Sequence, residues 1–294
     1  MLYHNTLGRM AALISGLALC WPAWSLNLVA TIPPLHSLVV QVAEPSDQVT
    51  LLIPASQSPH NFAMRPSMAR DLAQADGVFW MGPNLETGLA RALSQQANSV
   101  AVSSDRASTT DHGHHDDHDH HDHEDIHGWL SVRQSQQMLQ DIAHVLGQWD
   151  PTRAELFERR AEQASHKLER LFPKWTEQMQ SASTLRYWVF HDAYGAFEAE
   201  HGIDHQAVIQ INVNSNPSSR QLSALRGNMQ GQTGCAFIEP QLDPRWARLA
   251  IGDQPIEIRT LDPLGVAHQP GAELHRNVLA GMVQVFTECA ASTH

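Results

Sequence analysis

A histidine-rich acidic segment is the clearest candidate for chemistry in this sequence of 294 residues. Eight of the nineteen histidines and seven carboxylates fall between Asp111 and His127, in the run DHGHHDDHDHHDHEDIH. Imidazole is a common ligand for zinc, copper and nickel, and the interleaved carboxylates concentrate cations. With little apolar character to bury, the segment predicts a disordered metal-binding loop over residues 107–125 rather than an inert acidic linker. Its auxiliary metal-binding residues are predicted to be His112, His114, His115, His118, His120, His121 and His123.

Four further metal-capable side chains follow predicted strands. His60 lies in the loop after an apolar run that ends at residue 53, His191 directly follows RYWVF, and Asp262 follows IEIRTL. His127 ends the long histidine-rich loop after a fourth run. Ligands of open parallel sheets bind at the carboxyl ends of the strands, so these four side chains are expected to converge on one cleft. Three imidazoles with a carboxylate or water in the fourth place would form a tetrahedral zinc site.

The elements that must position these side chains alternate between short apolar runs and amphipathic segments. This alternation is typical of an α/β fold with mostly parallel sheets flanked by helices. Strands are predicted in two sets of four, at residues 27–31, 49–53, 77–80 and 99–102, and then at 186–190, 207–211, 235–238 and 256–261. Four strands in each half indicate two lobes, over residues 26–150 and 183–294, with the metal site in the cleft between them.

A long helix is predicted between the lobes, over residues 151–182. Its apolar residues recur every three or four positions and form one stripe, which favours a backbone helix that joins the lobes. Pro173 is expected to kink or restart this helix. The stripe consists of Phe157, Ala161, Ala164, Leu168, Leu171, Trp175 and Met179.

The first 25 residues are typical of a cleaved secretory signal. Arg9 precedes a short apolar stretch, and Ala23-Trp24-Ser25 fits the small-x-small cleavage pattern, so a periplasmic location is expected. A lipoprotein modified at Cys20 is the less favoured alternative. Export would leave two cysteines, Cys235 and Cys289, and an oxidising compartment favours a disulfide between them over two free thiols.

Several long motifs resemble one known family, in the same order and over nearly all of the mature chain. They are SPHNFAMRPSMARDLAQADGVFWMGPNLE, the histidine loop running into HGWLS, then VFHDAYGAFE, FIEPQ and TLDPLG. The family is that of the periplasmic metal-binding subunits of ABC importers, specifically the high-affinity zinc-uptake branch. The resemblance implies zinc ligation by His60, His127 and His191, with Asp262 near the fourth position. It also places the family's cysteine pair on Cys235 and Cys289.

The resemblance implies a function in transport without catalysis. A monomer would capture Zn²⁺ and deliver it to an inner-membrane ABC permease and its ATPase, and a periplasmic zinc chaperone is a further expected partner. Manganese-type relatives typically carry Glu where this chain has His191, and nitrogen ligands favour zinc. A metal-storage or chaperone protein is one alternative, and a zinc hydrolase is a less favoured one. The net charge of −12 argues against a nucleic-acid partner.

Overall fold

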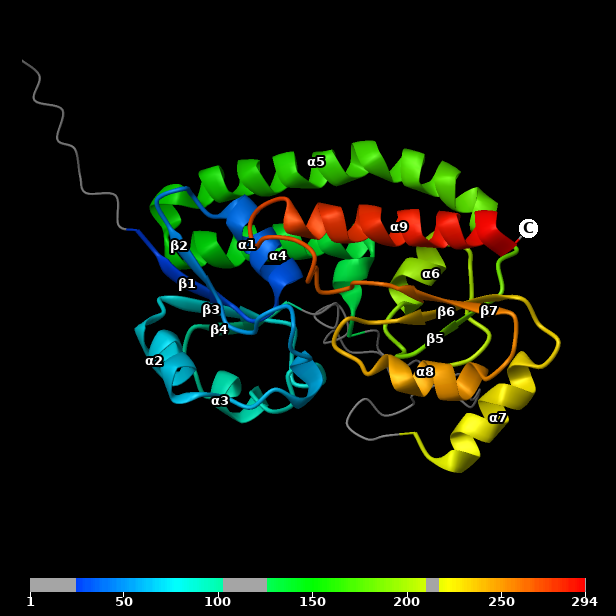
Figure 1. Ribbon diagram of the computed structural model, residues 1–294. Helices are drawn as coiled ribbons and strands as arrows, with labels where there is room; N and C mark the ends of the chain where they lie inside the picture. The colour runs from blue at the N-terminus through cyan, green and yellow to red at the C-terminus, as the bar shows by residue number, and fades with distance from the viewer. Residues whose placement is uncertain (1–24, 103–125, 210–216, 294) are drawn as a thin grey trace, which may run out of the picture.

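The computed structural model describes residues 25–102, 126–209 and 217–293. The predicted signal segment and the predicted histidine-rich loop lie outside these residues. The described chain forms two parallel sheets that lie side by side beneath a shared layer of long helices (Figure 1). Among the described helices, none is both long and apolar enough to cross a membrane.

The first sheet confirms the four predicted strands of the first lobe. Its strand order is β2-β1-β3-β4, and every pairing is parallel. The strands are β1 (Asn27–Ala30), β2 (Gln48–Leu51), β3 (Gly77–Trp80) and β4 (Ser99–Ala101). The helical segments between them are α1 (Pro33–Val42), η1 (Pro59–Asn61), α2 (Pro66–Gln74) and α3 (Ala90–Ser94). Pro66 occupies the first turn of α2, where its missing N–H leaves no hydrogen bond unmade.

Among the described residues, the second sheet has three strands, where four were predicted. Its order is β5-β6-β7, with β5 (Tyr187–Val189), β6 (Gly234–Ile238) and β7 (Ile256–Thr260) all parallel. The predicted strand at 207–211 contributes one bridge, between Val189 and Val208, and residues 210–216 lie outside the described part of the chain. The helices of this half are α6 (Gly195–His201), α7 (Ser219–Met229) and α8 (Pro244–Ile251).

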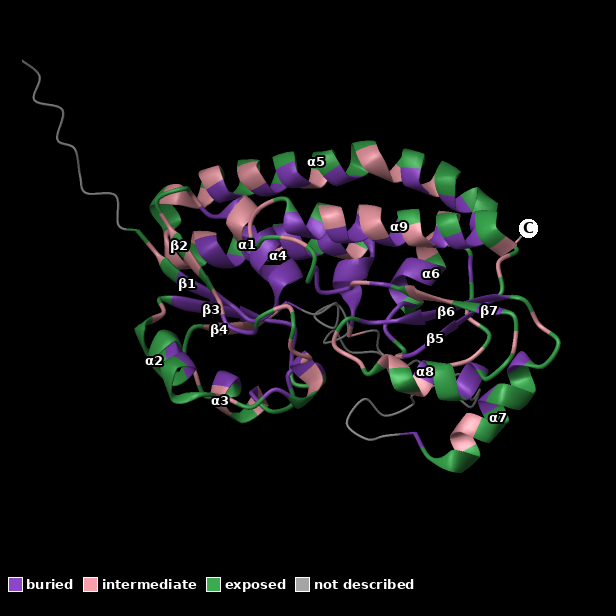
Figure 2. Ribbon diagram, in the orientation of Figure 1, coloured by how far each residue is buried: buried purple, intermediate pink, exposed green. Residues whose placement is uncertain are grey.

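Helices from the start, middle and end of the chain form the layer above the two sheets (Figure 1). They are α4 (Val132–Trp149), α5 (Ala154–Met179), α9 (Leu274–Thr293) and α1, and α9 packs against both α1 and α5. The short segments η3 (Gly128–Leu130), η4 (Pro151–Arg153) and η5 (Gln180–Ala182) precede or extend α4 and α5. The predicted stripe of α5 faces inward, as Figure 2 shows for the underside of this helix. Pro173 does not restart the helix, because α5 continues through it.

The two lobes share one large hydrophobic core, and the second lobe also encloses a smaller one. The large core runs from the first sheet through the long helices to one face of the second sheet. Alternation along β5 explains the boundary. Tyr187 and Val189 join the shared core, while Trp188 and Phe190 face a smaller cluster between the second sheet and helices α7 and α8. Packing of this kind makes the lobes one body, which favours small closing motions over a wide hinge.

The disulfide prediction is confirmed. Cys235 of β6 is bonded to Cys289 of α9, and both residues are fully buried. The bond therefore fastens the central strand of the second sheet to the last helix of the chain.

Candidate metal centre

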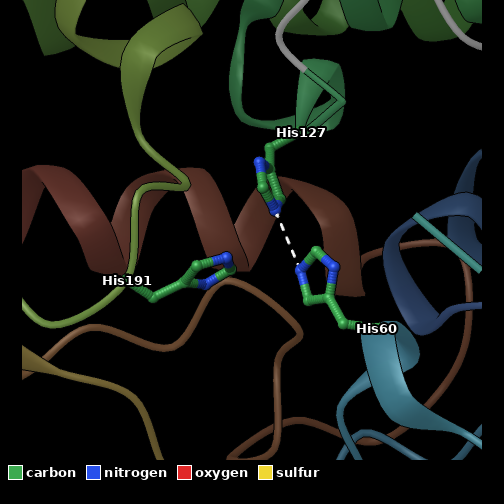
Figure 3. A group of neighbouring side chains, drawn as sticks. All are labelled: His60, His127 and His191. Carbon is green, nitrogen blue, oxygen red and sulfur yellow. Dashed lines mark hydrogen bonds between the residues drawn. The ribbon is translucent and has the colours of Figure 1, made fainter. Parts of the chain in front are cut away.

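Three imidazoles from distant parts of the sequence meet where the lobes face each other (Figure 3). His60 comes from η1 after β2, His127 precedes η3, and His191 follows β5 by two residues. The ring centroids lie 4.9 Å apart for His60 and His191, 5.0 Å for His127 and His191, and 5.5 Å for His60 and His127. One ring nitrogen from each residue lies within 4.8 Å of the others.

The spacing of two ring nitrogens suits a tetrahedral zinc ion. The Nε2 atoms of His60 and His127 are 3.4 Å apart. Two ligands of a tetrahedral ion with Zn–N bonds of ~2.0–2.1 Å are separated by roughly 3.3 Å. A zinc ion could therefore bind between these two rings with little movement of either.

Each histidine is held by contacts from its surroundings. The hydroxyl of Thr87 donates a hydrogen bond of 2.6 Å to the backbone carbonyl of His60. His127 is buried, and its ring packs against Trp129 at a centroid distance of 5.3 Å. His191 is fixed through Nδ1, which lies 2.9 Å from Oε1 of Glu239. Contacts of this kind orient ligands before a metal arrives.

Glu239 has no role among those predicted from the sequence. It follows the last residue of β6, so its position at a strand carboxyl end was the available signal. Burial alone would raise the pKa of Glu239, but His191, His127 and a hydrogen bond from Tyr194 lower it below its ordinary value. An ionised carboxylate on Nδ1 of His191 favours the tautomer that presents Nε2 as a ligand.

Asp262 lies outside the group of three histidines. Its Oδ1 atom accepts a hydrogen bond of 2.9 Å from the backbone N–H of Val266, and its Oδ2 atom accepts one of the same length from Ala267. Both carboxylate oxygens thus stabilise the turn that follows β7. The neighbouring Pro263 and Leu264 line the cavity around the histidines.

The cavity itself is formed by both lobes. Apolar walls come from Pro59, Trp129, Leu242 and Leu264. Across its edge, the Gln241 side chain donates a 2.6 Å hydrogen bond to the carbonyl of Ala55 in the loop that leads to His60. Few polar groups other than the imidazoles and Glu239 face this space, which makes it suited to a small cation and not to a large polar substrate.

A second group of metal-capable side chains consists of Glu198, Asp204 and His205. The carboxylate of Glu198 already has hydrogen-bond partners within the protein. The hydroxyl of Tyr187 donates to Glu198 at 2.7 Å, and Nδ1 of His205 lies 3.0 Å from the same carboxylate. The hydrogen bond to Glu198 raises the pKa of His205, against the effect of burial. We interpret this group as an ion pair that neutralises a buried carboxylate.

Another buried histidine, His275, supports the segment that carries His127. Its Nε2 atom lies 2.7 Å from the backbone carbonyl of Trp129 and 3.0 Å from the hydroxyl of Ser135. Its Nδ1 atom is buried, with no hydrogen-bond partner among the described residues. Burial lowers the pKa of His275 to about 4, because a proton on Nδ1 would place an uncompensated charge in the core.

The zinc-free protein is therefore expected to lose stability in mild acid. Burial, with the nearby His191 and His127, lowers the pKa of His60 to about 3, against 6.5 for an unperturbed histidine. As the pH falls below 6.5, His60 and His275 take up protons in the unfolded chain before they do so in the folded protein. The free energy of unfolding that they contribute above pH 6.5 is therefore lost as the pH falls toward 4. At pH 5 the loss is about 2 kcal/mol for each histidine.

Urea unfolding of the zinc-free protein at pH 7 and pH 5 measures this loss. The variant His275→Gln keeps a donor for the carbonyl of Trp129 and should show about half of the decrease. Equal free energies of unfolding at the two pH values would contradict the argument.

Known proteins similar to this chain were found by sequence and by structure. Residues 28–289 match the family described as zinc-uptake complex component A, periplasmic. The high-affinity zinc uptake system protein ZnuA of Paracoccus denitrificans is 32% identical over 297 residues, covering 90% of this chain and 91% of that protein.

Two solved structures share the fold. The periplasmic zinc-binding protein TroA from Treponema pallidum gives a TM-score of 0.77 at 19% identity, covering 91% of this chain and 99% of that one. The protein FpvC of P. aeruginosa, in complex with Ni²⁺, gives 0.76 at 18% identity, covering 92% and 98%. Since these two bind different metals, the fold alone does not select the ion. The sequence match over most of the chain shows that this protein belongs to the family of periplasmic zinc-uptake components, which are metal-binding proteins of transport systems and not enzymes.

Proposed function

We propose that this protein captures Zn²⁺ in the periplasm through His60, His127 and His191 and delivers it to an inner-membrane ABC permease driven by its ATPase. Cleavage of the predicted signal near residue 25 would export the chain as a monomer. The observation that carries the proposal is the meeting of three imidazoles between two lobes, with ring nitrogens within 4.8 Å of one another, in a member of a zinc-uptake family.

Asp262 or a water molecule is the proposed fourth ligand. Each carboxylate oxygen of Asp262 accepts one backbone hydrogen bond and keeps a further lone pair with which it can bind an ion. Three imidazoles favour zinc over manganese, which prefers oxygen ligands.

Metal analysis and competition titration of the mature protein test the proposal. The expected result is one tightly bound zinc per chain, with a dissociation constant in the nanomolar range, or about −12 kcal/mol. Manganese should compete poorly. A protein that binds manganese as tightly as zinc, or that has no tight site, would contradict the proposed function.

The histidine-rich segment is proposed to act as a weaker, multi-site antenna that raises the local zinc concentration or accepts zinc from a chaperone. Its sequence runs directly into His127, which motivates this role. Deleting residues 112–123 is expected to remove several weak zinc equivalents while the tight equivalent remains, as measured by calorimetric titration. Loss of the tight site in this variant would show instead that the segment supplies ligands to the main centre.

A further inference from the structure

A carboxylate of the second lobe, that of Glu200, contacts the segment that carries His127. Oε1 of Glu200, near the end of α6, accepts a 2.7 Å hydrogen bond from the hydroxyl of Ser131 and a 2.8 Å bond from the backbone N–H of Arg133. Oε2 accepts a 2.8 Å bond from the backbone N–H of Val132. Glu200 thus makes three hydrogen bonds with the first residues of α4.

These hydrogen bonds lie at the N-terminus of α4. The first N–H groups of α4 have no partners within the helix, and the helix dipole makes this end positive. Ser131 is the N-cap and accepts from the N–H of Gln134 through its own hydroxyl. The carboxylate of Glu200 satisfies the N–H groups of the two residues before Gln134, Val132 and Arg133, from positions 68 and 67 residues further along the chain.

The two partners are close in sequence to two different ligands. Ser131 follows His127 by four residues, with only η3 between them. Glu200 follows His191 by nine residues, at the far end of the short helix α6. One carboxylate therefore joins the segment of His127 to the segment of His191 across the lobes.

Other contacts of the segment that carries His127 are made with parts of the chain other than α6. The indole N–H of Trp129 donates a 2.9 Å hydrogen bond to the carbonyl of Pro263, and His275 contacts the carbonyl of Trp129. Pro263 and His275 belong to the chain after β7 and to α9, and neither segment carries a histidine of the centre. These contacts hold Trp129 in the core but do not tie His127 to His191.

We propose that Glu200 is a positioning residue for the metal centre, and that its hydrogen bonds with the start of α4 set the distance between His127 and His191. The inference rests on the proposed function and deepens it. Without Glu200, the start of α4 can separate from α6, and His127 moves away from the ion. The expected consequence is faster release of zinc.

The test uses the mature chain without residues 112–123, so that weak equivalents do not obscure the tight one. In this parent protein, Glu200→Ala is expected to raise the zinc dissociation constant about tenfold, the lower end of the 10–100-fold cost typical for partners that orient ligands. Transfer of zinc to a chelating dye, followed by stopped flow, should show a correspondingly faster release. The visible absorption of the Co²⁺-loaded protein should also change, because it reports ligand geometry.

Two variants separate positioning from general stabilisation. Ser218→Ala removes the side-chain cap of α7, far from the centre, and should lower stability without changing zinc release or the Co²⁺ spectrum. Glu200→Gln keeps one acceptor oxygen and should fall between Glu200→Ala and the parent. In a His127→Ala background, Glu200→Ala should have no further effect on zinc affinity, because the residue acts through His127.

The failure of this inference differs from the failure of the proposed function. If Glu200→Ala matches the parent in dissociation constant, release rate and Co²⁺ spectrum, while the parent binds zinc tightly, Glu200 is a helix cap only. If Ser218→Ala changes zinc release as much as Glu200→Ala does, the effect is general and the positioning role is refuted. A parent protein without a tight zinc site would overturn the proposed function itself.

Discussion

Replacing His60 by alanine is expected to weaken zinc binding by more than about 100-fold, since even the loss of a partner that only orients a ligand typically costs about 10–100-fold. His60 is the cleanest choice among the three histidines. His191→Ala would also remove the partner of the buried Glu239 carboxylate and could destabilise the fold. The measurement is a competition titration with a chelator of known zinc affinity.

The matched control for this prediction is His166→Ala. His166 is exposed on α5, away from the centre, and its Nδ1 atom lies 2.8 Å from Oε2 of Glu169. Its removal should leave the tight site unchanged. If His60→Ala kept the affinity of the parent, or if His166→Ala lost it, the three-histidine centre would be refuted.

Replacing both cysteines by alanine is expected to lower the free energy of unfolding by about 4 kcal/mol. Cys235 and Cys289 are 54 residues apart, and in the chain-entropy model a cross-link over a loop of this length restricts the unfolded state by about that amount. The double substitution leaves two small apolar side chains and no lone thiol. Urea unfolding of the parent and of the Cys235→Ala/Cys289→Ala variant measures the difference.

The position of the disulfide strengthens this expectation. Around it, Phe286 of α9 packs against Tyr187 and Phe237 of the second sheet, with centroid distances of 5.1 and 4.7 Å. Loss of the cross-link leaves this packing and the polar contacts of β7 with Glu288 and Ser292 as the attachments between helix and sheet. A thiol assay on the denatured mature parent should find no free thiol. Two free thiols, together with equal stability of the variant, would support the alternative of unpaired cysteines.

The fold of this protein could be predicted to a large extent from local patterns. Side-chain periodicity gave seven of the eight predicted strands within about two residues and the inward stripe of α5, because burial on one face imposes the pattern directly. The eighth, at 207–211, is one bridge beside β5 in the described residues. Apolar character alone cannot tell an edge segment that pairs once from one that pairs along its length.

The sequence by itself determined which side chains could bind a metal and that His60, His127 and His191 follow strands. Residue type and the carboxyl-end rule for parallel sheets are sufficient for that. Only the tertiary structure decided that Asp262 stabilises its own turn, that Glu239 holds His191, and that Glu200 joins two ligand segments. The physical reason is that hydrogen bonds between distant residues depend on how the lobes pack, and no local periodicity records that arrangement.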